Sequence, residues 1–287
     1  MSWTNDIASK YYRLIYDGKM DEAERIRHET IPKVLSKFIA LSNDENENEK
    51  RFCSLENNKI WISSIDAYND PFEFRTFYVD DAIVKAGGYD TSWRKAYQKW
   101  IYDYWKKAGV ASLSKNSFQS LPMWAYYSNN HSGFCVEYDV IDASKIWAVA
   151  YADKRIECAG KLCNLLIDIF NNIDENNIVH LTPQMRCTLA VLKMQLCSKH
   201  SSWEHEKEYR VIADLKEGGN GFNLDLSVAG LRVKRVIAGL NCKKEHVDRL
   251  QKISSFVFGK NIVKLQLDMF GKEYALLEEI HNEQNEI

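Results

Sequence analysis

The stretch SSWEHEKEYR, residues 201–210, gathers three glutamates, a histidine, a lysine and an arginine behind one tryptophan. Because EYRVIADL is rich in β-forming residues, we expect a strand, in which alternate side chains share a face. Glu206, Glu208 and Arg210 would then point the same way. An arginine can hold one carboxylate bidentately and keep it ionised, which leaves the other for chemistry. A structural lattice of salt bridges is the alternative, and the residues leave both open.

A second polar segment, AYNDPFEF (67–74), has the composition of a loop. Asn69 and Asp70 can hydrogen-bond to their own backbone, and Pro71 keeps Asp70 out of helical angles. With Glu73 they would line a pocket beside the preceding strand. The other interpretation is a structural turn in which Asp70 caps local N–H groups.

The third segment is MWAYYSNNHSGF (123–134), which combines aromatic side chains with a histidine. Trp124 and Tyr127 have the spacing of one buried helical face, which favours core packing. An aromatic ring here could instead stack on a nicotinamide or a nucleobase. His131 is a candidate acid–base group or ligand, although a loop histidine often bonds only to its neighbours.

Common metal and nucleotide motifs are missing from the sequence. It contains no HExxH, GxSxG, GxGxxG or Walker loop, and His200 and His205 have no cysteine at a zinc-finger spacing. We therefore predict no metal site. The segment 91–108 interleaves aromatic and basic residues, but its aromatics keep helical spacing, so a core-facing helix is favoured over a nucleic-acid contact.

The composition is that of a globular protein. Of 287 residues, 45% are hydrophobic and 27% charged, and the net charge of −2 gives no basic surplus for general nucleic-acid binding. The seven cysteines are scattered without a CxxC pair, which indicates reduced thiols rather than disulfides or zinc. No apolar run approaches the ~20 residues of a membrane span, so we expect a cytoplasmic protein without membrane contact.

Periodicity predicts an α+β fold with a mixed, mainly antiparallel central sheet flanked by helices. Helices are expected over 5–17, 19–30, 91–108, 155–172, 183–199 and 243–253. Strands are expected over 33–41, 59–64, 133–140, 145–153, 206–215, 233–240 and 261–270, the fourth as a hairpin partner of the third. The acidic run 43–50 is expected to be a loop. Residues 1–30 would form an N-terminal helical extension, and residues 31–287 a single domain.

Taken in order, these segments resemble a bacterial family known as domain of unknown function 2971. KFIAL, AYNDPFEF, MWAYY with HSGFCVE, and WEHEKEYR carry the resemblance, which spans about residues 30–240. Tyr68 stands where the family usually has phenylalanine, and Tyr126 where it often has histidine. The second departure weakens any histidine-based mechanism at that position.

The layout is also similar to ADP-ribosyltransferase-like proteins, and this likeness implies a chemistry. Breaking the nicotinamide–ribose bond of NAD develops oxocarbenium character, which a carboxylate stabilises. Glu206 or Glu208 would supply that carboxylate. NAD would be a substrate rather than a tightly bound cofactor. The likeness also implies that Trp124 or Tyr126 stacks on the nicotinamide. Ribose or phosphate would be held by Lys37, Asn69 or Ser114.

Three hypotheses follow. The first is an enzyme acting on NAD or a nucleotide, with a protein or nucleic-acid target and a setting in phage defence or stress responses. The second is a metal-dependent nuclease that uses Asp70, Glu73, Glu206 and Glu208. The third is a non-catalytic sensor that docks a partner through residues 5–30.

Overall fold

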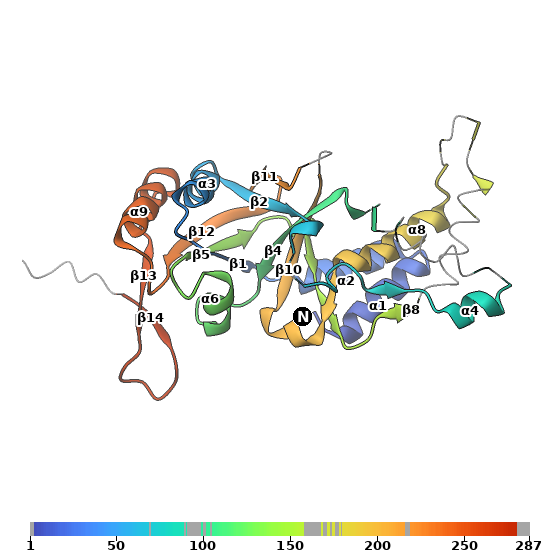
Figure 1. Cartoon of the computed structure of the whole chain (residues 1–287), viewed down its shortest axis with the longest axis horizontal. Helices are drawn as coiled ribbons and strands as arrows, with labels where there is room; N and C mark the ends of the chain where they lie inside the picture. The colour runs from blue at the N-terminus through green and yellow to red at the C-terminus, as the bar shows by residue number, and fades with distance from the viewer. Residues whose placement is uncertain are drawn as a thin grey trace, which may run out of the picture.

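Most of the predicted strands join one large sheet in the computed structural model of the chain, together with strands that were not predicted, among them Ala108–Ser114 and Gly221–Asp225 (Figure 1). The structure describes residues 3–68, 70–88, 105–157, 180–215 and 219–279, together with 90, 99, 102–103, 168, 171–172, 174–175 and 178. Among these, the sheet order is β11 (Gly221–Asp225), β2 (Lys59–Ser64), β4 (Ala108–Ser114), β1 (Val34–Ile39), β5 (Phe134–Val140), β12 (Leu231–Ala238), β13 (Val263–Leu267) and β14 (Leu276–Glu278). β10 (Glu208–Asp214) pairs with β4 and with β6 (Ile146–Ala148). The β12–β13 pair is parallel and the other pairs of this sheet are antiparallel, which confirms the predicted α+β class.

Strand β4 is where the sheet divides. One edge of β4 pairs with β10 along its whole length. The other edge pairs with β1 only at Ser114 and with β2 only at Gly109 and Val110. The carbonyl group of Ser112, between these two contacts, accepts a hydrogen bond from Lys37 instead of a strand partner. The polar residues described below collect around this division.

Two helices cover one face of the sheet and a shorter helix packs on the other. α3 (Glu45–Glu56) and α9 (Lys244–Phe258) lie side by side in Figure 1 and contribute Phe52, Leu55, Leu250 and Ile253 to the main core. α6 (Leu121–Tyr127) places Trp124 against Phe38 of β1 on the opposite side. The sheet is therefore covered on both faces where β1 and β5 run through it.

The prediction of a loop over 43–50 is wrong, because α3 starts inside it. Asp44 caps the helix by accepting from the N–H groups of Asn46 and Glu47 at 3.0 and 3.3 Å. Glu45 and Glu47 lie in the first turn, where carboxylates interact favourably with the helix dipole. The acidic run is thus suited to starting a helix.

The predicted N-terminal helices are confirmed as α1 (Asn5–Tyr16) and α2 (Met20–Thr30). α1 lies against α8 (Pro183–Leu192), and buried residues of both form a small separate core (Figure 1). Arg27 of α2 is 2% exposed, donates to the carbonyl of Ser144 at 3.2 Å and lies over the Trp147 ring at 4.1 Å. Much of the apolar face of these helices is therefore covered by this chain. A separate extension over 1–30 stays a prediction.

Other boundaries differ from the predictions. Residues 145–153 form no hairpin with β5: β6 pairs with β10, and β7 (Ala150–Ala152) with β9 (Ser198–His200). The helix expected over 183–199 ends at Leu192, and a 3₁₀ helix η3 (Lys193–Leu196) and β9 follow. β14 is a further strand after the one expected last. The remaining short elements are η1 (Ile65–Ala67), β3 (Phe77–Tyr78), α4 (Asp81–Ala86), η2 (Ala143–Lys145) and β8 (Ile156–Glu157).

Two of the predicted helices cannot be compared in full. The segments 91–108 and 155–172 fall largely outside the described residues, although Ala108 already belongs to β4 and Ile156 to β8. In the described part of the chain, no helix combines the length and apolarity needed to cross a bilayer. The five cysteines described there are free thiols.

Candidate functional site

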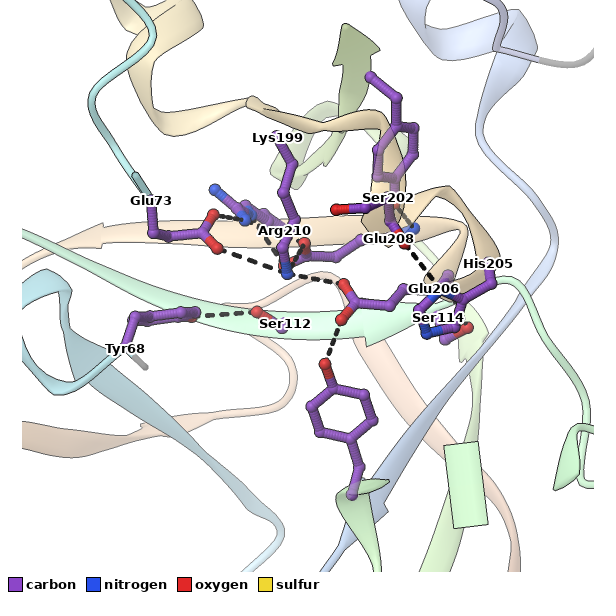
Figure 2. A network of polar contacts seen from close by, with 12 residues as sticks. Tyr68, Glu73, Ser112, Ser114, Lys199, Ser202, His205, Glu206, Glu208 and Arg210 are labelled. Atoms are coloured by element: carbon purple, nitrogen blue, oxygen red, sulfur yellow. Dashed lines mark hydrogen bonds and ion pairs between the residues drawn. The ribbon is translucent and has the colours of Figure 1, made fainter. Parts of the chain in front are cut away.

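The strand predicted from EYRVIADL is β10, and it brings Glu208 and Arg210 to one face as expected. Glu206 differs from the prediction because it ends the 3₁₀ helix η4 (Ser201–Glu206) rather than lying in the strand. Lys207 then takes a left-handed conformation (φ 46°) that links η4 to β10. The turn still directs Glu206 towards Glu208, so the three residues meet by a different route (Figure 2).

Arg210 is the centre of the site and is fully buried, with 0% of its surface exposed. Its Nε and Nη2 atoms donate to the two carboxylate oxygens of Glu208 at 2.8 and 2.9 Å, a bidentate pair. Nη2 also pairs with Glu73, and Nη1 donates to the carbonyl of Leu196 at 2.6 Å. Arg210 thus holds two buried carboxylates of this site, those of Glu73 and Glu208.

Lys199 of β9 joins the same group from above (Figure 2). Its Nζ lies 2.7 Å from Glu206, 3.4 Å from Glu73 and 3.5 Å from Glu208. The side chain is 8% exposed, and its ammonium lies 4.9 Å from the centre of the Trp203 ring. Glu73, Lys199, Glu206, Glu208 and Arg210 are called the ionic cluster below.

The carboxylates of the ionic cluster are not equivalent. Burial acts to raise the pKa of Glu208, but the charges of Arg210 and Lys199 outweigh it and lower that pKa to about 2. Burial raises the pKa of Glu206, and the neighbouring Glu208 adds to the rise against the opposing charge of Lys199. Glu208 is therefore fixed as an anion, whereas Glu206 takes up a proton more readily than Glu208 does.

Glu206 is also held differently from its neighbours. The hydroxyl of Tyr127, at the end of α6, donates to one carboxylate oxygen, and Lys199 binds the other. Burial and this hydrogen bond raise the pKa of Tyr127, so it remains a donor. Ser114 fixes the backbone here, since its Oγ donates to the Glu206 carbonyl at 2.5 Å. Ser114 is therefore a positioning residue, and it contacts this backbone rather than open space.

Lys37 lies next to the ionic cluster, at the division of the sheet. Its Nζ donates to the carbonyl of Ser112 at 3.1 Å. Burial lowers the pKa of Lys37 to about 8, although the charge of Glu208 opposes that shift. Tyr68 occupies the same division, with its hydroxyl 3.2 Å from the Val110 carbonyl and 3.0 Å from Ser112 Oγ. The structure thus brings Lys37 towards the predicted glutamates.

The lowered pKa of Lys37 predicts how stability depends on pH. Between the folded pKa of about 8 and the ordinary lysine value of about 10.4, the unfolded chain binds more protons, so stability rises with pH. We expect the free energy of unfolding of wild type, measured in urea from pH 7.5 to 10, to rise by about 1–3 kcal/mol relative to that of Lys37→Met. Lys33→Met, at an exposed position of the same segment, is the control. A constant difference between wild type and Lys37→Met would contradict the assignment.

Other candidate residues do not reach the ionic cluster. The Asp70 carboxylate accepts a hydrogen bond from the N–H of Phe72 at 2.8 Å. This contact matches the structural turn that was the alternative to a pocket wall. Trp124 is 0% exposed and donates to the Phe118 carbonyl, so the prediction that it stacks on a ligand is wrong and core packing explains it. His131 stacks on Trp124 at 5.7 Å, in a turn of residues with positive φ. Asn69 lies outside the described residues.

Tyr126 remains a candidate. Its side chain is 70% exposed, and its ring lies 6.2 Å from that of His205 in η4. It therefore lies on the surface close to the segment that carries Glu206, and a stacking role stays a prediction.

Sequence reasoning missed several residues that complete the site. Lys199 had been assigned to a helix, and Tyr127 to the core. Tyr151, whose hydroxyl accepts from the Glu208 N–H at 2.8 Å, was not considered. The available signal was weak: a lysine between a serine and a histidine does not indicate burial until Lys199 is known to reach Glu73, Glu206 and Glu208. Glu73 had been considered only as a pocket wall or a nuclease ligand.

The ionic cluster is poorly suited to a divalent cation, because Lys199 and Arg210 already occupy its centre. Within the described residues, three potential ligand atoms come within 4.8 Å of one another only at Glu45, Glu245 and His246. Lys243 lies 3.7 Å from both of those glutamates and supplies a positive charge there.

The comparison with protein families concerns the segment that carries most of this cluster. Residues 123–211 match the family model described as protein of unknown function (DUF2971). The DUF2971 match runs from α6 to β10 and includes Lys199, Glu206, Glu208 and Arg210. The resemblance expected over about 30–240 is thus supported over this part. No curated protein and no solved structure matches the chain.

Proposed function

We propose that the protein is an enzyme that breaks the bond between nicotinamide and ribose in NAD, or the equivalent bond of another nucleotide, with Glu206 as the acting carboxylate. The observation that carries this proposal is the inequality of the buried carboxylates. Arg210 forms ion pairs with Glu73 and Glu208. Glu206 has a raised pKa, and its carboxylate is held instead by Lys199 and Tyr127.

The chemistry fits a carboxylate in this setting. When the C1′–N bond breaks, both electrons leave with the neutral nicotinamide and positive charge develops on the ribose. An ionised carboxylate in a water-poor site stabilises that charge more than it would in water. A water molecule, or a nucleophile of a protein or nucleic-acid target, then bonds to C1′ and gives its proton to Glu206.

Access to Glu206 requires a change in its surroundings, since it is 4% exposed. η4 is a short 3₁₀ helix with exposed residues on either side of Glu206, so it is the element suited to moving. A cavity of about 840 Å³ lies against this helix and is lined by Glu204, Lys207 and Glu208 as well as by residues of the chain start. Its volume lies within the ~300–1,000 Å³ of small-molecule sites.

The nuclease hypothesis has less support, because Asp70 serves a turn and two cations neutralise the other carboxylates. We include a setting in phage defence or stress responses in the proposal on the basis of the sequence resemblance alone.

The direct test is to incubate the purified full chain with NAD and measure released nicotinamide by chromatography. We expect nicotinamide release that rises in proportion to protein concentration. AMP, which lacks the nicotinamide, serves as a blank. Absence of nicotinamide release from NAD, with no base released from other nucleotides, would contradict the proposed function.

A further inference from the structure

A second cavity, of about 280 Å³, opens beside Lys199. Three segments that are distant in the sequence form it: the loop after Pro71, the connection between β7 and β8, and strand β9. It is lined by Phe72, Arg75, Thr76, Ala152, Asp153, Lys154, Arg155, Ser198, Lys199 and His200. Its volume is below the ~300–1,000 Å³ typical of whole-ligand pockets, so it suits one small group of a larger molecule.

The lining of this cavity carries more cationic than anionic side chains. Arg75, Lys154 and Arg155 contribute cations, and Lys199 forms the boundary with the ionic cluster. Asp153 is the acidic residue of the lining, and Ser201 donates a hydrogen bond to its carboxylate. Arg155 is braced by its Nε–H, which donates to the Arg75 carbonyl at 2.6 Å. Several cationic side chains around one small cavity favour the binding of an anion with several oxygens.

His200 adds a hydrogen-bond donor. Its Nδ1 accepts from the Ser202 N–H at 3.2 Å, so in the neutral ring the proton lies on Nε2. That N–H is then available to a ligand. Thr76 and Ser198 supply hydroxyl groups to the same lining. The donors of the cavity therefore outnumber its acceptors, as binding of a phosphate requires.

Phe72 gives the cavity an apolar edge. Its ring is 65% exposed although it belongs to the same loop as the buried Glu73 and Phe74. An exposed aromatic ring beside a cationic cavity can stack on a base or a sugar while the cations hold the attached phosphates.

We propose that this cavity binds the phosphate groups of a nucleoside diphosphate moiety, with Phe72 against its base or sugar. The inference deepens the proposed function and rests on it, since it names the cavity that would hold the phosphate groups of the nucleotide substrate. Lys199 is the shared residue: it lines the cavity and lies 2.7 Å from Glu206. The phosphates would then lie beside the acting carboxylate.

Calorimetric titration of the full chain with ADP, pyrophosphate and adenosine tests the site without any reaction. We expect ADP and pyrophosphate to bind and adenosine to bind at least about tenfold more weakly than ADP, because charged hydrogen bonds supply the affinity. Arg75→Ala and Lys154→Ala should each weaken ADP binding about tenfold. Lys252→Ala, which removes an exposed lysine of α9, should leave ADP binding unchanged, and circular dichroism confirms that each variant is folded.

The outcomes separate this inference from the proposed function. Equal binding of ADP and adenosine, or unchanged ADP affinity in both Arg75→Ala and Lys154→Ala, would overturn the phosphate site even if NAD is cleaved. ADP binding that depends on Arg75 and Lys154, without nicotinamide release from NAD, would support the phosphate site and reject the proposed reaction.

Discussion

Replacing Arg210 with methionine is expected to destabilise the protein by about 3–5 kcal/mol, the usual cost of leaving a buried charge without its partner. Arg210 is 0% exposed, and its loss leaves the three glutamates of the ionic cluster with the single charge of Lys199 in place of two cations. The Leu196 carbonyl loses its donor as well. For a chain of this size, the midpoint of thermal unfolding should fall by about 10 °C.

Arg232→Met is the matched control, because Arg232 forms an exposed ion pair with Asp139 at 3.2 Å. Exposed pairs contribute about 0–1 kcal/mol, so this variant should unfold close to wild type. Adding Glu73→Gln and Glu208→Gln to Arg210→Met should restore part of the loss, since it removes the uncompensated charges. Equal midpoints for Arg210→Met and Arg232→Met in calorimetry would show that the ionic cluster does not contribute to stability in this way.

Local patterns predicted much of the fold because the residues that set those elements lie close together in the chain. The apolar spacing on either side of Gly18 defined α1 and α2, and the Tyr and Val content of 208–215 defined β10. The predicted start of a helix at residue 183 agrees with the structure, where the Thr182 hydroxyl accepts from the Met185 N–H at 3.2 Å and caps α8. In each case, a local rule agrees with the tertiary structure.

The failures arise where contacts between distant segments decide the structure. The acidic run 43–50 has the composition of a solvated loop. It starts a helix because Phe52 and Leu55, later in the same helix, pack into the core and stabilise it. Residues 145–153 cannot be assigned to a partner strand from their own pattern, because β10 lies about sixty residues away along the chain.

In the candidate site too, local patterns predict some positions correctly and contacts between distant segments decide the others. Glu208 and Arg210 were placed correctly because two residues of one strand share a face by geometry. Lys199 could not be found, because it reaches the ionic cluster from another strand. The position of Glu206 depends on a left-handed lysine, which propensity does not predict. Aromatic character alone also failed to distinguish the buried Trp124 from the exposed Tyr126.

Glu206→Gln is expected to lower the rate of nicotinamide release by at least about a hundredfold, the usual effect of removing one electrostatic contact to a transition state. Glutamine keeps the shape of the side chain: its amide oxygen can accept from Lys199 while its NH2 group donates to the Tyr127 hydroxyl, so packing is retained. It lacks the charge that would stabilise the ribosyl cation and the basic oxygen that would accept a proton. Stability should change little, because Arg210 continues to pair with Glu73 and Glu208.

Glu204→Gln is the control for this variant, because Glu204 is an exposed glutamate of the same short helix. At saturating NAD it should release nicotinamide within a few-fold of the wild-type rate, because Glu204 lines the cavity of about 840 Å³ and can affect substrate binding but is not the acting carboxylate. Comparison of the two variants separates the charge at position 206 from a general effect on η4.

The most direct test of the central claim is the rate of nicotinamide release from NAD by Glu206→Gln, measured beside wild type, Glu204→Gln and their thermal midpoints. We expect a loss of at least about a hundredfold for Glu206→Gln, with its midpoint within a few degrees of wild type. A wild-type rate for Glu206→Gln would contradict the role of Glu206. A midpoint as low as that of Arg210→Met would instead make Glu206 a structural member of the ionic cluster.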